Sequence, residues 1–215
     1  MIGIVLAAGG STRMAEIGQI KPVLDWFGKP MLEHVLQQAK ASQLNAVWVV
    51  VGCCTQQTTL VAQAAGADKI LQNPDWLSGL ASSIQLAVRH ALETDNDALA
   101  FILADCPLLE PAHIDAAIAC SQNAPNRIVR AHHAGLYGHP VIFPRAYWQD
   151  LLEIPGNDSG GRFIFQKYAD FIVSVNLPST AIFDIDTPSD YAMAKQAYLS
   201  GEESLDLSHK TEVIV

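Results

Sequence analysis

The sequence has little charge, a shortage of basic residues and no long apolar run. Only 16% of its 215 residues are charged, and 13 Lys and Arg residues stand against 22 Asp and Glu, a formal net charge of −9. Nucleic-acid binding depends on cations that neutralise phosphates, so this balance argues against a DNA- or RNA-binding protein. It leaves room for an anionic small molecule, because a few cations in a cleft can outweigh the net charge locally.

Membrane and export segments are not expected either. No apolar run approaches the roughly 18 residues that cross a bilayer. The apolar N-terminus follows no basic segment and is interrupted by Gly9 and Gly10, which argues against a signal peptide. The few cysteines form no C-x-x-C pair, which argues against a zinc site and favours free thiols in a reducing compartment. They are Cys53, Cys54, Cys106 and Cys120. We therefore expect a cytoplasmic protein that contacts no membrane.

Half of the sequence is hydrophobic, and its apolar runs of strand length alternate with segments of helical period. The expected strands are residues 2–7, 46–52, 98–104 and 171–177, with weaker candidates at 127–131 and 139–144. The expected helices are residues 30–42, 58–66, 80–93 and 111–121. This alternation predicts a mostly parallel sheet covered on both faces, with ligands bound beyond the carboxyl ends of its strands. We expect one domain over residues 1–199 and a polar tail over residues 200–215, either frayed or in an oligomer contact.

The first predicted strand runs directly into the turn "LAAGGSTRM" (6–14). Gly9 and Gly10 allow a tight bend and close approach of backbone amides to a ligand. Ser11 adds a hydroxyl, Arg13 a planar fork of donors that suits phosphate oxygens, and Lys21 a second cation. These groups predict a triphosphate-binding turn. The alternative is an ordinary glycine turn with a surface Arg and Lys.

Two common nucleotide-binding fingerprints are absent. The sequence contains neither G-x-x-x-x-G-K-[ST] nor G-x-G-x-x-G. A P-loop hydrolase is therefore excluded, and an ordinary dinucleotide-binding oxidoreductase is disfavoured.

A carboxylate follows the third strong strand candidate in "FILADCPLL" (101–109). Asp105 stands at its carboxyl end, where it would face the same ligand as the first turn. Mg²⁺ prefers hard oxygen ligands together with substrate phosphates, so Asp105 is a candidate metal ligand, with Mn²⁺ as a possible replacement. The alternative is that Asp105 caps the following turn. We interpret Cys106 as a packed thiol and not a nucleophile, because no base stands near it in the sequence.

Three further segments carry candidate binding residues. In "NPDWLSGLASS" (73–83), Gly79 and Ser83 suit a nucleotide base, although Ser at a helix start is also an ordinary cap. A second group suggests a second substrate: Gly138, His139 and Pro140 in one stretch, and Asp158, Gly160 and Arg162 before a helix. A lone histidine is more often structural, which stays the alternative for His139.

The segment "FDIDTPSDY" (183–191) carries two more carboxylates. Asp184 and Asp186 are expected on the same side of a strand, two residues apart, and Asp186 is the stronger candidate to complete the metal site. The alternative, which is compatible with the first, is a strand end followed by a helix that begins at Pro188 with Thr187 as its cap.

Taken in their order along the chain, these segments resemble the motifs of the molybdenum cofactor cytidylyltransferases, within the MobA-like NTP transferase superfamily. "LAAGGSTRM…GQIK" is similar to L-A-A-G-x-S-x-R-M-G-x-x-K, "DCPLL" to D-x-P-x-L, and "NPDWLSGLASS" to N-P-x-x-x-x-G-x-x-x-S. The later segments are similar to G-H-P-[VI], D-x-G-A-R and D-I-D-T-P-x-D-[YF]. Residues 15–17 (AEI) lengthen the first loop, and Gly161 replaces the usual Ala.

The resemblance implies a three-layer α/β/α sandwich of the Rossmann-like nucleotidyltransferase type. It implies transfer of CMP from CTP to molybdopterin cofactor with Mg²⁺, and a molybdoenzyme or its chaperone as a possible partner. Arg13, Lys21 and Asp105 would be catalytic, and Asp105 and Asp186 would bind metal. The implied nucleotide-binding residues are Leu6, Ala7, Ala8, Gly9, Gly10, Ser11, Arg13, Lys21, Gly79 and Ser83. Those implied for the second substrate are Gly138, His139, Pro140, Asp158, Gly160 and Arg162.

Other functions stay open at this point. The nearest are GMP transfer to the same cofactor and cytidylyl or uridylyl transfer to a sugar or polyol phosphate; "LAAG" in place of "LAGG" favours cytidine by resemblance. A non-catalytic nucleotide sensor or cofactor chaperone is the second alternative, and an NAD-dependent oxidoreductase the third.

Overall fold

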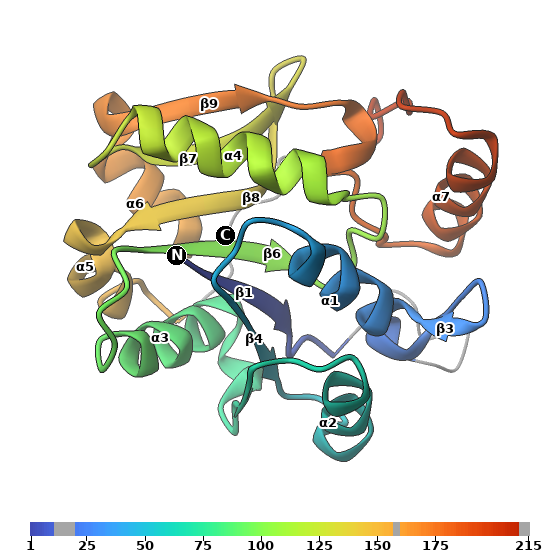
Figure 1. Cartoon of the computed structure of the whole chain (residues 1–215), viewed down its shortest axis with the longest axis horizontal. Helices are drawn as coiled ribbons and strands as arrows, with labels where there is room; N and C mark the ends of the chain where they lie inside the picture. Colours follow the sequence, from blue (N-terminus) through green and yellow to red (C-terminus); the bar gives the residue numbers. More distant parts are fainter. Residues whose placement is uncertain (11–19, 157–159, 211–215) are drawn as a thin grey trace.

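A seven-stranded sheet forms the centre of the molecule, as the computed structural model shows for residues 1–10, 20–156 and 160–210 (Figure 1). Its strand order is β5-β4-β1-β6-β8-β7-β9, and all neighbouring pairs are parallel except those that β8 makes with β6 and β7. The prediction of a mostly parallel sheet is confirmed. The strands are β1 (Ile2–Ala7), β4 (Ala46–Val51), β5 (Lys69–Gln72), β6 (Ala98–Leu103), β7 (Ile128–His133), β8 (Leu136–Pro144) and β9 (Ile172–Asn176).

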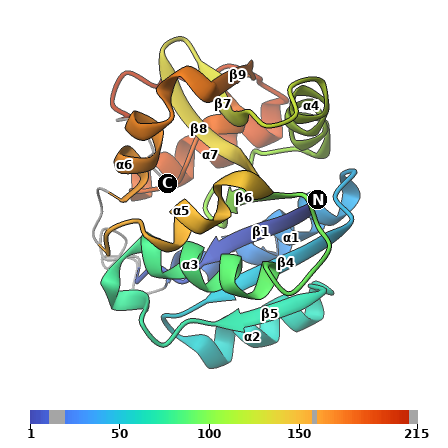
Figure 2. The same cartoon turned by 90° about the vertical axis from the view of Figure 1, so that its left-hand side faces the viewer.

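Helices cover both faces of this sheet, which confirms the three-layer fold (Figure 2). One face packs against α1 (Met31–Ala41), α2 (Thr55–Ala64), α4 (Pro111–Asn123) and α7 (Pro188–Ser200). The other packs against α3 (Leu80–Ala91), α5 (Trp148–Leu152) and α6 (Gly160–Lys167). A small hairpin of β2 (Asp25–Trp26) and β3 (Lys29–Pro30) lies beside the sheet.

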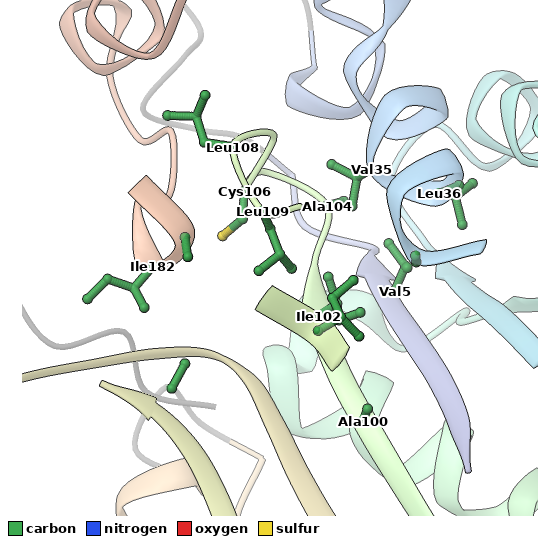
Figure 3. Close-up of a cluster of buried hydrophobic side chains, with 14 of the residues drawn as sticks. Val5, Val35, Leu36, Ala100, Ile102, Ala104, Cys106, Leu108, Leu109 and Ile182 are labelled. Atoms are coloured by element: carbon green, nitrogen blue, oxygen red, sulfur yellow. The ribbon is translucent and has the colours of Figure 1, made fainter. Parts of the chain in front are cut away.

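The central strands β1, β4 and β6 are apolar along their length because both of their faces are buried. Side chains alternate across a strand, so Val5 of β1 joins the cluster beneath α1 while Ile4 and Leu6 join the cluster beneath α3. Figure 3 shows the first cluster, where Val35 and Leu36 of α1 lie near Val5. The continuous apolar run of β1 therefore suits a central strand, because each face of it packs against a helix layer.

The loop after β6 is anchored by its own apolar residues. Cys106, Leu108 and Leu109 belong to the same cluster as Ile182, and all four are labelled in Figure 3. Cys106 is only 1% exposed, which confirms it as a packed thiol, and burial raises the pKa of this thiol well above its usual value. The loop therefore holds Asp105 in a fixed place at the carboxyl end of β6.

The sequence missed some elements and misplaced others. It gave no expectation for β5, for the β2–β3 hairpin or for α5. The expected strand at residues 171–177 is confirmed as β9, which lies at the edge of the sheet beside β7 and is partly exposed. The prediction that Asp184 and Asp186 share a strand is wrong, because residues 183–187 form no strand and follow the short helix η6 (Ser179–Ile182).

The described part of the polar tail lies against the domain. The amide of Leu205 donates to Ser179 Oγ at 2.6 Å, and Leu207 is buried in the cluster beneath α1. The proposed boundary at residue 199 stays a prediction, but residues 201–210 contribute contacts to the same core.

Candidate active site

A cleft of about 460 Å³ opens where β1 and β6 end. Its lining comes from the end of β1 and the turn after it, from the end of β6, and from the start of α3 with the residues before it. The lining residues are Leu6, Ala7, Ala8, Gly9, Gly10, Lys21, Pro22, Trp76, Leu77, Gly79, Leu80, Ser83, Leu103, Ala104 and Asp105. The volume lies within the roughly 300–1,000 Å³ of small-molecule sites.

Most of the residues predicted for the nucleotide line this one cleft. The sequence separates them widely, yet Leu6 to Gly10, Lys21, Gly79, Ser83 and Asp105 meet at the carboxyl edge of the sheet. Ser11 and Arg13 lie outside the described residues, as does the insertion at residues 15–17. Nucleotide binding by all of these residues stays a prediction.

Trp76 is the main cleft residue that sequence reasoning missed. It lies in the short helix η3 (Trp76–Ser78), and a Cβ built on Gly10 would come within 2.9 Å of its ring atom Cζ3. Glycine at position 10 therefore lets the turn pass under the indole ring. The only signal in the sequence was the position of this tryptophan, inside a segment already selected for Gly79 and Ser83.

The start of α3 is held by a hydrogen-bonded amide. Asn73 Nδ2 donates to Ser82 Oγ at 2.8 Å and to Ser83 Oγ at 2.9 Å, and Asn73 and Ser83 are both buried. Gly79 precedes the helix with φ of 90°, a conformation that favours glycine. Ser83 is therefore not the ordinary helix cap of the alternative, since no side chain caps this helix start.

Two carboxylates meet on the ammonium group of Lys21, which lies in η2 (Lys21–Val23). Lys21 Nζ is 2.9 Å from Asp105 Oδ2 and 2.7 Å from Asp186 Oδ1. Burial disfavours the charged ammonium, but the two carboxylates outweigh this and raise the pKa of Lys21 above its usual value. The structure thus brings together the predicted catalytic cation and both predicted metal ligands.

The donor set suits a hard divalent cation. Two carboxylates already converge on one positive charge, and Mg²⁺ is commonly held by one or two carboxylates that are completed by substrate phosphates and water. Among the described residues no three His, Cys, Asp or Glu side chains gather in a metal-binding group. Asp105 and Asp186 would hold the ion together with the substrate, and the ion would supply charge neutralisation at the phosphates.

Asp184 takes a different partner from Asp186. Its Oδ1 lies 3.2 Å from Lys210 Nζ, and burial raises the pKa of Asp184 to about 6, with the charge of Asp105 adding to this rise. Lys210 also contacts Asp190 Oδ2 at 2.9 Å. The four aspartates of this region are therefore shared between two lysines.

The residues predicted for the second substrate form two groups. Gly138, His139 and Pro140 are buried, whereas the structure describes little of Asp158, Gly160 and Arg162. His139 is 1% exposed, forms a cis peptide bond with Pro140, and its ring nitrogens have no hydrogen-bond partner among the described residues. Burial and the nearby Arg130 lower the pKa of His139 to about 3, so its ring is neutral. A Cβ on Gly138 would come within 2.7 Å of Ile182 Cβ.

The other group starts α6. Asp158 lies outside the described residues, and for Gly160 and Arg162 the structure gives only their places in α6. Contact of either group with a second substrate stays a prediction.

Comparison with known proteins now decides the family. The model of the MobA-like NTP transferase domain matches residues 3–171. The chain belongs to the MobA-like NTP transferase family. It is a nucleotidyltransferase, which replaces the oxidoreductase alternative.

Two relatives of this MobA-like chain match over nearly their full length. It is 27% identical to the purine catabolism protein PucB of Bacillus subtilis, over 92% of this chain and 97% of that protein. It is 26% identical to the molybdenum cofactor cytidylyltransferase of Escherichia coli, over 91% of this chain and 95% of that protein. The manganese complex of Rv0371C from Mycobacterium tuberculosis has the same fold, with a TM-score of 0.73, 19% identity and coverage of 91% of this chain and 98% of that one.

No helix in the described ranges 1–10, 20–156 and 160–210 has the length and apolar character needed to span a bilayer.

Proposed function

We propose that this nucleotidyltransferase transfers CMP from CTP to the phosphate of molybdopterin cofactor. An oxygen of the acceptor phosphate forms a new bond to the α-phosphorus of CTP while the bond from that phosphorus to pyrophosphate breaks. The products are a cytidine dinucleotide form of the cofactor and pyrophosphate. No covalent bond to the enzyme is required, so catalysis consists of alignment and charge neutralisation.

One observation carries this proposal: the glycine turn, Lys21 and Asp105 line a single cleft at the carboxyl edge of the sheet. This is the edge at which open α/β sheets bind their ligands. Backbone amides at Gly9 and Gly10 would approach the triphosphate, and Lys21 would neutralise its developing charge. Gly79, Ser83 and Trp76 would border the base.

The choice of cytidine and of molybdopterin rests on resemblance. The "LAAG" sequence favours cytidine. The relative from Escherichia coli is named a molybdenum cofactor cytidylyltransferase, and the match covers 95% of that protein. GMP transfer to the same cofactor is the nearest competing reaction, because it needs the same phosphate chemistry.

The test is pyrophosphate release by the purified chain with each of the four NTPs and Mg²⁺, with and without molybdopterin. We expect release with CTP only when molybdopterin is present. Release with GTP in place of CTP would reassign the nucleotide, and release with a sugar or polyol phosphate as acceptor would reassign the acceptor. CTP binding without pyrophosphate release from any acceptor would identify a nucleotide sensor instead.

A further inference from the structure

Lys210 contacts residues on both sides of the candidate metal ligand Asp186, and it lies in a part of the chain that the family model does not cover. The match ends at residue 171, whereas Lys210 stands in the tail after α7. Its Nζ donates to the main-chain oxygen of Asp184 at 2.6 Å and lies 3.2 Å from Asp184 Oδ1. It also lies 2.9 Å from Asp190 Oδ2. Its side chain is only 10% exposed, so these contacts are largely shielded from water.

The tail that carries Lys210 is docked by independent contacts. Leu207 is buried, and the amide of Leu205 donates to Ser179 Oγ. Within the tail, the amide of Lys210 donates to Leu207 O at 2.8 Å. Lys210 Nζ also lies 4.6 Å from the centroid of the Phe183 ring. The position of Lys210 is thus set by packing as well as by charge.

The partners of Lys210 stand at the two ends of the segment that carries Asp186. Asp184 precedes it, and Asp190 Oδ2 accepts hydrogen bonds from the amides of Asp186 and Thr187, each at 2.9 Å. Between them, the amide of Ile185 donates to the main-chain oxygen of Asp105 at 2.9 Å. The segment is therefore held at both ends by one ammonium group and tied at its centre to the other candidate ligand.

The four aspartates around this segment pair with two different lysines. Lys21 contacts Asp105 and Asp186, while Lys210 contacts Asp184 and Asp190. Lys210 thus neutralises two of the aspartates, while Asp105 of the cleft and Asp186 have Lys21 as a counter-ion. Removing one partner of a buried pair leaves an uncompensated charge, which the segment would relieve by moving.

We propose that Lys210 is a positioning residue that fixes Asp186 for metal binding. This inference rests on the proposed function, because Asp186 must be a metal ligand for its placement to matter. Partners that orient metal ligands commonly change metal affinity by about 10–100-fold when they are mutated.

The experiment measures Mn²⁺ binding to the full chain, without nucleotide and with CTP, by electron paramagnetic resonance of the free ion, with CTP alone as the reference. It also measures turnover in the pyrophosphate assay. Lys210→Met should weaken Mn²⁺ binding at least about tenfold and lower turnover in parallel. Lys210→Arg, which keeps the charge and the donors, should restore most of both. Lys210→Gln, which keeps a donor without the charge, replaces Lys210→Met if that variant does not fold.

Two controls separate Lys210 from the docking of the tail and from general loss of an ion pair. His209→Gln changes the neighbouring residue, whose Nε2 contacts the other oxygen of Asp190 at 3.0 Å. Lys40→Met removes a surface pair with Asp68 at 3.1 Å. Both should bind Mn²⁺ within about twofold of the wild type. The Lys40 pair lies on the surface, and His209→Gln leaves the contact of Lys210 with Asp190 in place.

Mn²⁺ binding by Lys210→Met or Lys210→Gln within twofold of the wild type would overturn the inference and leave the proposed function standing. An equal loss in His209→Gln would overturn it as well, because the tail and not Lys210 would then carry the effect. Wild-type protein that binds no Mn²⁺ by itself, and none with CTP beyond what free CTP holds, would overturn the metal site itself, and the inference with it.

Discussion

At the scale of single residues, the ammonium group of Lys21 lies where a metal ion would contact Asp105 and Asp186. Lys21→Met should therefore have two opposite effects. Turnover should fall about 100-fold, because a contact to the developing charge is lost. Mn²⁺ affinity of the nucleotide-free chain should rise several-fold, because no ammonium competes for the two carboxylates. Paired turnover and Mn²⁺ titrations check this, and weaker Mn²⁺ binding in the variant would contradict it.

Asp105 is the residue on which the chemistry depends most. Asp105→Ala should lower turnover at least about 100-fold, the usual cost of one lost transition-state charge contact, while the fold survives. Arg13→Ala should have an effect of the same size. Steady-state rates measure both effects, and thermal melting of each variant controls for folding. Near-normal turnover of Asp105→Ala would refute the metal assignment.

His139 makes the stability of the protein depend on pH. Its pKa falls from 6.5 in the unfolded chain to about 3 in the fold, so the unfolded state takes up a proton first as the pH drops. The contribution of neutral His139 to the free energy of unfolding is fully present above pH 6.5 and is lost as the pH falls towards 3. From pH 7.5 to 5 the wild type should lose about 2 kcal/mol more than His139→Gln. Urea unfolding at both pH values measures this difference, and equal losses would exclude it.

At the scale of elements, α7 begins with reciprocal hydrogen bonds. The Thr187 hydroxyl accepts from the amide of Asp190, and the Asp190 carboxylate accepts from the amide of Thr187. Thr187→Ala should lower the free energy of unfolding by about 1 kcal/mol, whereas Thr187→Ser should keep most of it. Denaturant unfolding of the three proteins checks this, and equal stability of Thr187→Ala and wild type would contradict it.

An element can be predicted when neighbouring residues in the sequence determine it, and not when it forms through contacts with distant segments. β1, β4 and β6 follow from apolar runs buried on both faces, and the start of α7 follows from Thr187 and Pro188. β5 has only four residues, of which Leu71 alone is buried, so its strand character comes from pairing with β4. The sequence carries no local signal for such pairing.

The candidate site shows the same limit. The meeting of Gly9, Gly10 and Asp105 could be predicted, because parallel strands end at one edge of a sheet. The contact of Lys210 with Asp184 could not, because it joins a polar tail to a loop through a fold that must already exist. The packing of Trp76 over Gly10 is of the same kind.

At the scale of the whole molecule, the loop after β6 and the tail are anchored on the core beneath α1, whereas Ala8 of the first turn and the start of α3 are anchored on the core beneath α3. Cys106, Leu108 and Ile182 lie together in the core beneath α1 (Figure 3), and Leu207 of the tail belongs to the same cluster. A substrate at the carboxyl edge would therefore contact segments distributed over most of the chain.

The placement of Trp76 in the cleft has an optical consequence. Trp26, Trp48 and Trp148 are buried at 2%, 7% and 0% exposure, while Trp76 is partly open at the cleft wall. Intrinsic fluorescence should therefore change on adding CTP and report occupancy without any label. The change should vanish in Trp76→Phe, and a full response in that variant would trace the signal to another indole.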